Sequence, residues 1–310
     1  MNEYIIEAEE LEFTYPDGTR ALKGASLRIR RGAKIALLGS NGAGKSTLFL
    51  HFNGILKPQK GKLRFNGVEV RYDKKSLLQL RKDVGVVFQD PDTQLFSASV
   101  YQEISFGPLN MGLSRETARE KVLQAMEDTG ISELKDKPTH FLSYGQKKRV
   151  SIADVLAMDP KVIIADEPTV WLDPKHAKQI ERLFRDINEK GTTVIISTHD
   201  VDLAYAWADY IFVIHEGKII GEGNPEDIFA DDILIRKAGL ERPWILDITG
   251  LLIEKGFLTN KTPYPRNKKE LIKMINCTKY LGGTENQYDL STFRDEGRDA
   301  NYIPVGRTRK

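Results

Sequence analysis

Short apolar runs alternate along this chain with stretches in which apolar residues recur at helical spacing. Runs dominated by Val, Ile and Leu predict buried strands at 34–38, 84–88, 161–166 and 192–198. The apolar spacing of 174–190 predicts a helix between the last two strands. Strands that alternate with helices form mostly parallel sheets covered on both faces. The pattern therefore predicts an α/β fold.

Other segments predict an antiparallel part beside this sheet. Residues 4–15 are rich in β-branched and aromatic residues and end at a Pro-Asp-Gly turn. Residues 62–65 predict a strand that leads into an Asn-Gly turn. Residues 210–223 predict a hairpin that turns at Glu216 and Gly217.

A helical region interrupts the strand-helix alternation between about Asp90 and Asp159. Within it, 115–129 and 146–158 have helical spacing of their apolar residues. We therefore expect one large domain over 1–240, with the helical region as an insertion.

The end of the chain differs from this domain. Residues 244–255 and 268–280 predict two amphipathic helices. The stretch 282–310 is polar and ends in basic residues, and we expect it to be partly disordered. We treat 241–310 as a C-terminal extension.

Composition narrows the possible functions only a little. The 310 residues carry a formal net charge of +2, which gives no argument for a nucleic-acid partner. Cys277 is the single cysteine, so no disulfide can form within the chain. The acidic N-terminus does not resemble a signal peptide. The longest apolar runs are far shorter than the roughly 20 residues of a membrane-spanning helix, so a membrane role would require a partner.

The strongest chemical signal is the string GSNGAGKST, which fits G-x-x-x-x-G-K-[ST] between a predicted strand and a predicted helix. Backbone amides of such a loop surround a triphosphate at a helix N-terminus. Lys45 can reach the β- and γ-phosphates, and the Ser46 hydroxyl can bind Mg²⁺. A glycine-rich turn without a ligand is the alternative. The P-loop consists of Gly39, Ser40, Asn41, Gly42, Ala43, Gly44, Lys45, Ser46 and Thr47.

A second signal is VIIADEP, in which a buried strand ends in two carboxylates. Asp166 can hold Mg²⁺ through water, and Glu167 can polarise an attacking water as a base. An apolar strand followed by Asp-Glu is common by itself. Downstream of a P-loop it indicates nucleotide hydrolysis.

The order of further motifs carries a family resemblance. Gln89 ends a strand, LSYGQKKRV precedes the Asp-Glu strand, EPTVWLDP follows it, and His199 comes directly after the strand TTVIIST. Along about Glu7 to Gly239 the chain resembles the ATP-binding-cassette family. The resemblance implies a P-loop NTPase cassette with a helical signature subdomain. It also implies ATP hydrolysis with ATP and Mg²⁺ at the site.

The resemblance assigns three residues to ATP bound by the same chain. Tyr15 matches the aromatic residue that stacks on adenine, as a flat ring can. Gln89 matches the residue that contacts Mg²⁺ and senses the transport partner, and an amide can both donate and accept. His199 matches the histidine that contacts the γ-phosphate. With Lys45 and Glu167, Gln89 and His199 form the expected catalytic set.

Other matched residues act across a dimer. Ser143 and Gly145 match residues that cap the γ-phosphate of ATP held by a second ATPase subunit. Gln146 is expected to open the next helix and to aim its N-terminal dipole at that phosphate. Asp173 matches the loop that crosses the dimer interface. The partner is either a second copy or a sister cassette.

Two positions depart from the family pattern. Tyr144 stands where the LSGGQ signature has its first glycine. Trp171 stands where a small residue is common in the Asp loop. A bulky aromatic residue at a dimer interface can add packing or hinder closure, which affects the expected geometry of the second site.

Longer strings narrow the resemblance further. FTYPDGTRAL, VFQDPDTQLF and LSYGQKKRVSIA resemble the ATPase subunits of energy-coupling-factor importers, with the cobalt and nickel members nearest. The tail is similar to the short C-terminal dimerising extension of that group, the alternative being a mobile appendage. This resemblance implies a peripheral protein at the cytoplasmic face of the cell membrane. It also implies integral membrane transport subunits as partners and no direct contact with the transported substance.

Alternatives remain at this stage. A vitamin importer of the same architecture fits the same motifs. A soluble cassette ATPase that acts on nucleic acid or the ribosome usually needs a second cassette or a long coiled coil, and this chain has one P-loop and no sustained heptads. We expect no nucleic-acid partner.

The groove beside 89–96 is the expected docking surface for a membrane subunit. Asp90, Asp92 and Gln94 would offer acceptors there, and Leu95 and Phe96 would offer an apolar anchor.

Overall fold

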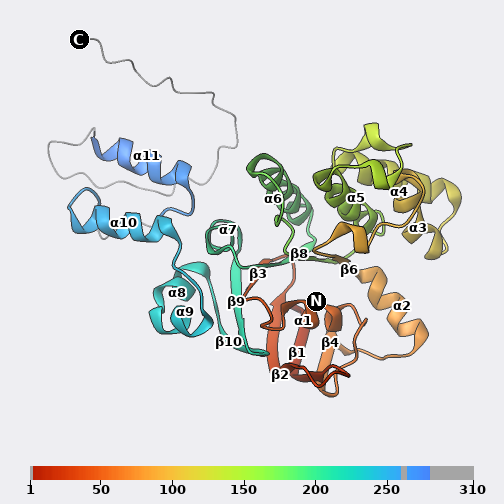
Figure 1. The fold of residues 1–310 in the computed structure, drawn as a ribbon, viewed down its shortest axis with the longest axis horizontal. Helices are drawn as coiled ribbons and strands as arrows, with labels where there is room; N and C mark the ends of the chain where they lie inside the picture. The colour runs from red at the N-terminus through yellow and green to blue at the C-terminus, as the bar shows by residue number, and fades with distance from the viewer. Residues whose placement is uncertain (1–2, 260–263, 280–310) are drawn as a thin grey trace, which may run out of the picture.

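The computed structural model describes residues 3–259 and 264–279. A mixed six-stranded sheet lies at its centre (Figure 1). Five neighbouring strands of this sheet run parallel, and β10 pairs antiparallel at one edge. In spatial order the strands are β10 (Lys218–Gly223), β9 (Tyr210–His215), β3 (Lys34–Leu38), β8 (Thr193–Thr198), β7 (Val162–Asp166) and β6 (Val84–Val87).

A second sheet is antiparallel throughout. Its strands, in spatial order, are β2 (Arg20–Arg30), β1 (Tyr4–Thr14), β4 (Lys60–Phe65) and β5 (Val68–Glu69). Helix α1 (Lys45–Phe52) lies between the two sheets (Figure 1). Its buried side chains Leu48, Phe49 and Phe52 share one apolar core with Ile35 and Leu37 of β3. This packing fixes the start of α1 at the end of β3.

The other face of the main sheet carries its own core. Ala36 and Leu38 of β3 point into it, because successive residues of a strand face opposite sides. The helices that contribute to this core are α5 (Tyr144–Leu156), α6 (Pro174–Glu189), α7 (Val201–Trp207), α8 (Pro225–Ala230), α9 (Asp232–Ala238), α10 (Trp244–Glu254) and α11 (Lys268–Lys279).

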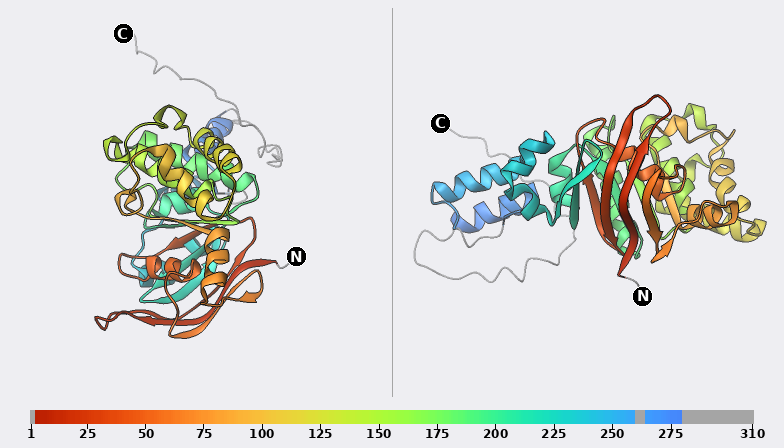
Figure 2. Two further views of the ribbon diagram at one scale, coloured as in Figure 1. Left: turned by 90° about the vertical axis from the view of Figure 1, so that its right-hand side faces the viewer. Right: turned by 90° about the horizontal axis from the view of Figure 1, so that it is seen from below.

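The helical insertion has a separate core. Helices α3 (Val100–Asn110), α4 (Arg115–Asp128) and α5 (Tyr144–Leu156) form it, with three short 3₁₀ turns at Pro91–Thr93, Ser132–Leu134 and Thr139–Phe141. Figure 2 shows the insertion at one end of the molecule and α10 with α11 at the other.

The predicted fold class is confirmed in its main features. The parallel strands, the antiparallel part and the hairpin at Glu216 and Gly217 are all present. Helix α2 (Lys74–Asp83) was missed by the sequence analysis, because only Leu80 among its leucines is buried and no apolar stripe results. The boundary near 240 stays a prediction. Residues 280–310 lie outside the described residues, and with them the end of the second predicted helix and the expected disordered tail.

Candidate functional site

The P-loop connects β3 to α1, as its sequence predicts. Gly42 and Gly44 have φ values of +79° and +108°, which L-residues with side chains rarely adopt. A Cβ on Gly39 would lie 2.4 Å from the carbonyl oxygen of Ile214, so only glycine fits there. On Gly42 a Cβ would meet no atom within 4 Å, which leaves that side of the loop open. The path of the loop therefore depends on glycine at Gly39, Gly42 and Gly44.

Lys45 lies inside this loop. Its ammonium donates to the carbonyl oxygens of Gly39 at 2.7 Å and Ser40 at 3.2 Å. It also lies 3.6 Å from Oε1 of Glu167, and both side chains are buried. A charged, buried lysine at a helix N-terminus makes this site strongly attractive to a phosphate anion.

The carboxyl ends of β7 and β8 bring two further polar groups to the P-loop. Ser46 donates its hydroxyl to Oδ2 of Asp166 at 2.5 Å. The hydroxyl of Ser197 donates to the other oxygen of Asp166 and accepts the backbone N–H of Glu167 at 2.9 Å. Ser197 was missed by the sequence analysis, although it stands at the end of the predicted strand TTVIIST. It fixes the orientation of both carboxylate residues.

Glu167 follows β7 directly and has a left-handed backbone, with φ of 44°. Its Oε2 lies 3.1 Å from Nδ1 of His199, which comes from the end of β8. Its Oε1 is buried and has no hydrogen-bond partner among the described residues. A buried acceptor without a donor is costly, and a bound water or ligand can satisfy it.

Tyr15 lies beside the same loop. Its hydroxyl is 3.1 Å from Oγ1 of Thr47, and its ring packs edge-on against Phe13 with centroids 5.0 Å apart. The structure thus places the predicted adenine-stacking residue at the P-loop helix. Its stacking role stays a prediction.

The signature residues form the N-terminus of α5. Ser143 caps this helix: its Oγ accepts the N–H of Gln146 at 3.4 Å, and Oε1 of Gln146 accepts the N–H of Ser143 at 3.0 Å. The expectation that Gln146 opens the helix is wrong by two residues. The helix begins at Tyr144, because the reciprocal cap places Gln146 at its third position.

In the part of the chain that the structure describes, no hydrogen bond joins the signature to the P-loop. Ser143 is exposed, and Gly145 faces Leu172 and His176 of its own chain. Asp173 caps α6 by accepting the N–H groups of Lys175 and His176. The hydrogen bonds from His176 lower the pKa of Asp173. Among the described residues, Ser143, Gly145 and Asp173 therefore make no hydrogen bond to the residues assigned to the chain's own ATP.

Comparison with known proteins decides the family. The model of the family described as ABC transporter matches residues 22–170. The energy-coupling factor transporter ATP-binding protein EcfA of Methanocaldococcus jannaschii is 51% identical over 252 residues, 81% of this chain and 90% of the relative. EcfA3 of Clostridium perfringens is 51% identical over 83% of this chain and 91% of its own length. The chain belongs to the ABC transporter ATP-binding proteins.

Solved structures agree with this membership. CbiO1 from Clostridium perfringens, described as part of the ABC transporter complex CbiONQ, is 50% identical with a TM-score of 0.70, over 82% of this chain and 100% of that one. A dimeric ATP-binding cassette solved with ADP and Pi is 27% identical with a TM-score of 0.65, over 71% of this chain and 98% of that one. As a member of this family, the protein is an ATP-binding ATPase.

The residues of this ATPase fit a magnesium nucleotide. The hydroxyl of Ser46 and the carboxylate of Asp166 are hard oxygen donors of the kind that Mg²⁺ prefers. Among the described residues no group of three or more His, Cys, Asp or Glu side chains could hold a metal by itself. Such a site needs phosphate and water oxygens to complete it, as is usual for Mg²⁺ bound with a nucleotide.

Residues 88–96, which we call the glutamine loop after Gln89, are bound to the helical insertion by side chains that the sequence analysis did not single out. Lys148 of α5 is fully buried and donates to the carbonyl oxygens of Phe88 at 3.0 Å and Gln89 at 2.6 Å. Burial lowers its pKa to about 8. Glu103 of α3 accepts the N–H of Phe96 at 2.9 Å. A charged residue in a predicted amphipathic helix gives no sequence signal that it will be buried.

One expectation about this loop is wrong. Gln94 was expected to offer an acceptor to a partner, but its side chain bonds within its own chain, to the loop and to helix α5. Its Oε1 accepts the N–H of Phe88 at 3.3 Å, and its Nε2 donates to the carbonyl of Ser151 at 3.0 Å and to Asp154 at 3.2 Å. Gln94 therefore stabilises the loop.

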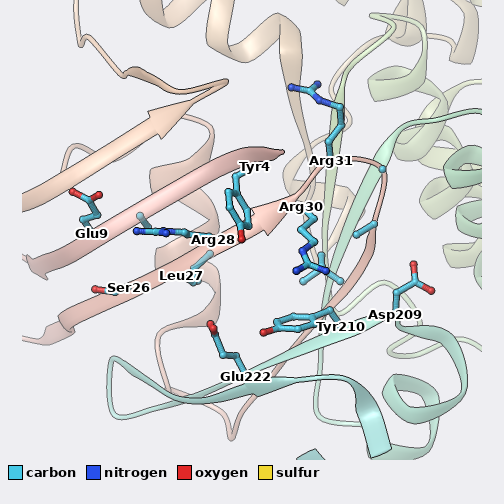
Figure 3. A pocket seen from close by; sticks show the side chains of 14 residues that line it. Tyr4, Glu9, Ser26, Leu27, Arg28, Arg30, Arg31, Asp209, Tyr210 and Glu222 are labelled. Atoms are coloured by element: carbon cyan, nitrogen blue, oxygen red, sulfur yellow. The ribbon is translucent and has the colours of Figure 1, made fainter. Parts of the chain in front are cut away.

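A cavity of about 590 Å³ lies away from the nucleotide site, between the two sheets (Figure 3). It opens at the amino end of β3, whereas the P-loop follows the carboxyl end of that strand. Arg28, Arg30 and Arg31 line it together with Glu9, Asp209 and Glu222, so its charges balance. It shows no preference for a ligand of either sign.

Within residues 3–259 and 264–279, no helix combines the length and apolar character needed to cross a membrane.

Proposed function

We propose that this ATPase is the ATP-hydrolysing subunit of an energy-coupling factor importer for cobalt ions, with nickel as the next candidate. The observation that carries the hydrolytic part is the position of Glu167. One of its oxygens contacts His199 at 3.1 Å; the other is buried 3.6 Å from the Lys45 ammonium and has no hydrogen-bond partner among the described residues. A water bound at this second oxygen would lie beside the P-loop.

Each residue then has a definite task. Glu167 accepts a proton from the attacking water. His199 holds the carboxylate in place through Nδ1 and can turn its other ring nitrogen toward the γ-phosphate. Lys45 neutralises phosphate charge, and Ser46 with Asp166 would hold Mg²⁺, which neutralises the charge that develops on the phosphates.

Glu167→Gln tests this assignment. The amide keeps the size of the side chain but cannot take the proton, so turnover should fall by about 100-fold or more while ATP still binds. Glu189→Gln, at the exposed end of α6, is the matched control and should keep the parental rate. Near-parental hydrolysis by Glu167→Gln would exclude Glu167 as the base.

The membrane partner and the metal rest on the relatives. Two relatives about half identical to this chain are named energy-coupling factor transporter ATP-binding proteins, and a solved relative is named as part of the complex CbiONQ. We infer that the chain works as a dimer at the cytoplasmic face of a membrane, docked on integral membrane subunits.

Uptake measurements test the transported ion. Deleting the protein should lower uptake of radiolabelled cobalt, and to a smaller degree nickel, in cells without a compensating transporter. Restoring the parental chain should restore uptake, and Glu167→Gln should not. Normal uptake of both metals in the deletion strain would reject the metal assignment and favour a vitamin as the transported substance.

A further inference from the structure

The two positions at which this chain departs from the family pattern contact each other. The rings of Tyr144 and Trp171 meet edge to face, with centroids 5.7 Å apart and planes at 77°. Tyr144 opens the signature helix α5, and Trp171 belongs to the Asp loop between β7 and α6. A glycine at the first position and a small residue at the second could not make this contact.

The hydroxyl of Tyr144 makes a third connection. It donates to the backbone carbonyl of Gln89, in the glutamine loop, at 2.9 Å. Burial raises the pKa of Tyr144 to about 12, with Asp90 and Asp92 adding to the rise, so the hydroxyl keeps its proton near neutral pH. Lys148 donates to the same carbonyl, and its ammonium lies 5.8 Å from the centre of the Tyr144 ring.

Trp171 links these contacts to the proposed catalytic base, Glu167, through the sequence of the Asp loop. It lies four residues after Glu167 and two before Asp173. The turn that starts at Glu167 is closed by the N–H of Val170, which donates to the Glu167 carbonyl at 3.3 Å. Trp171 has a φ of 64°, unusual for a bulky residue, so contacts must hold its backbone in place.

We propose that Tyr144 is a positioning residue that joins the signature helix, the glutamine loop and the Asp loop of one chain into a single moving unit. A displacement of Gln89 is then transmitted through the Tyr144 ring to Trp171, and from there to the turn that carries Glu167. The proposal rests on ATP hydrolysis by this chain and not on the identity of the transported substance. An error in the metal assignment would leave its tests unchanged.

The first test is Tyr144→Phe, which removes the hydroxyl and keeps the ring. The kcat for ATP should fall about fivefold, the factor expected for one neutral hydrogen bond. The KM for ATP should stay within about twofold, because the P-loop residues that bind phosphate are untouched. Tyr101→Phe removes a hydroxyl elsewhere in the insertion and should change neither constant. An unchanged kcat in Tyr144→Phe, or a rise in KM that accounts for the whole loss, would overturn the proposal.

The second test uses Trp171 as its own probe. The chain has three tryptophans: Trp171 is 68% exposed, Trp244 is 42% exposed, and Trp207 is buried. In a Trp244→Phe background, iodide quenching therefore reports on Trp171. Saturating Mg·ATP should change this quenching in the parental sequence. In Tyr144→Phe the change should fall by at least half, because the hydrogen bond that joins the Tyr144 ring directly to the glutamine loop is lost.

Full retention of the quenching change in Tyr144→Phe would overturn the proposal, since Trp171 would then respond to nucleotide without the link.

The ring contact is tested by Tyr144→Leu and Trp171→Leu, alone and together. The double variant should lose no more kcat than the worse single variant, because both remove the same contact. Losses that multiply would show two independent roles and would also overturn it.

Discussion

The carboxyl end of the main sheet and the N-terminus of α5 both carry residues assigned to ATP, but they are built differently. At the sheet, Lys45, Ser46, Asp166 and Glu167 contact one another within a single chain. At α5, the hydrogen bonds that the exposed Ser143 makes within the described residues stay inside its own helix. In the first region, called the closed region below, the charged groups and hydrogen-bond donors contact one another. The second is an exposed helix N-terminus, which we propose binds ATP held by a second subunit.

In the dimer that we propose, this difference would leave one cassette with half of each hydrolytic site. At the sheet, Lys45 pairs with Glu167, and Asp166 accepts from the hydroxyls of Ser46 and Ser197, so this half is held together by contacts within one chain. The N-terminus of α5 keeps its positive dipole end and an exposed hydroxyl, which suit a phosphate held by a second subunit. A dimer with each signature against the partner's P-loop would complete both sites.

Lys45→Ala should have the largest effect, because it removes the cation from the closed region. We expect the affinity for Mg·ATP to fall by about 100-fold or more, since each charge-assisted hydrogen bond to phosphate contributes about 2 kcal/mol. Calorimetric titration measures this. Lys75→Ala, on the exposed side of α2, is the control and should bind normally. Unchanged affinity in Lys45→Ala would remove the P-loop assignment.

The second prediction tests whether α5 serves the other subunit. Lys45→Ala and Ser143→Ala chains should each be nearly inactive alone. A dimer with one chain of each kind has one site with both lesions and one site with neither. Such a dimer should recover roughly half of the activity of a parental dimer. If purified mixed dimers stay inactive, the head-to-tail arrangement is wrong.

The third prediction concerns docking on the membrane subunits. Phe96 is 68% exposed and stacks edge-on against Phe106, with centroids 5.0 Å apart, whereas the Gln94 side chain is bonded to Asp154 of α5. Phe96→Ala should weaken co-purification with the membrane subunits by roughly 30-fold, as expected for loss of an aromatic anchor. Phe257→Ala removes an equally exposed ring from the other end of the molecule. Equal loss in both variants would contradict a specific docking surface at Phe96.

The comparison also shows what sequence can reveal. The closed region was recognisable because its chemistry lies in short contiguous strings, such as the P-loop and VIIADEP, at the ends of obvious strands. The order of those strings also indicated the fold class. Most of the side-chain contacts that join these sequence motifs could not be predicted from the sequence. Ser197, Lys148 and Glu103 look like ordinary strand or helix residues, and only tertiary contacts make them supports of the site.

The two departures illustrate the same limit. Tyr144 and Trp171 could be noticed one at a time because each breaks a local pattern. Their contact could not be predicted, because it depends on how α5 packs against the Asp loop. The prediction that Gln94 belongs to the docking surface was wrong for a related reason. A polar side chain in a loop has many possible partners, and the sequence does not say whether they are internal.

The smallest effect that we predict is a change in stability with pH. It comes from Lys148, the buried lysine that holds the glutamine loop, and exposed lysines should not show it. Lys148 has a pKa of about 8 in the folded chain, against an ordinary value of 10.5, because burial disfavours its charge. Between these values the unfolded chain binds more protons than the folded chain, so stability rises with pH. From pH 7.5 to 9 this contribution to the free energy of unfolding should grow by about 1 kcal/mol. Urea unfolding of the parental chain and of Lys148→Met at both pH values measures it, and the Met variant should lack this increment. Lys82→Met, an exposed lysine on α2, controls for loss of a surface charge. The same pH dependence in the parental chain and Lys148→Met would show that Lys148 is not the group that titrates.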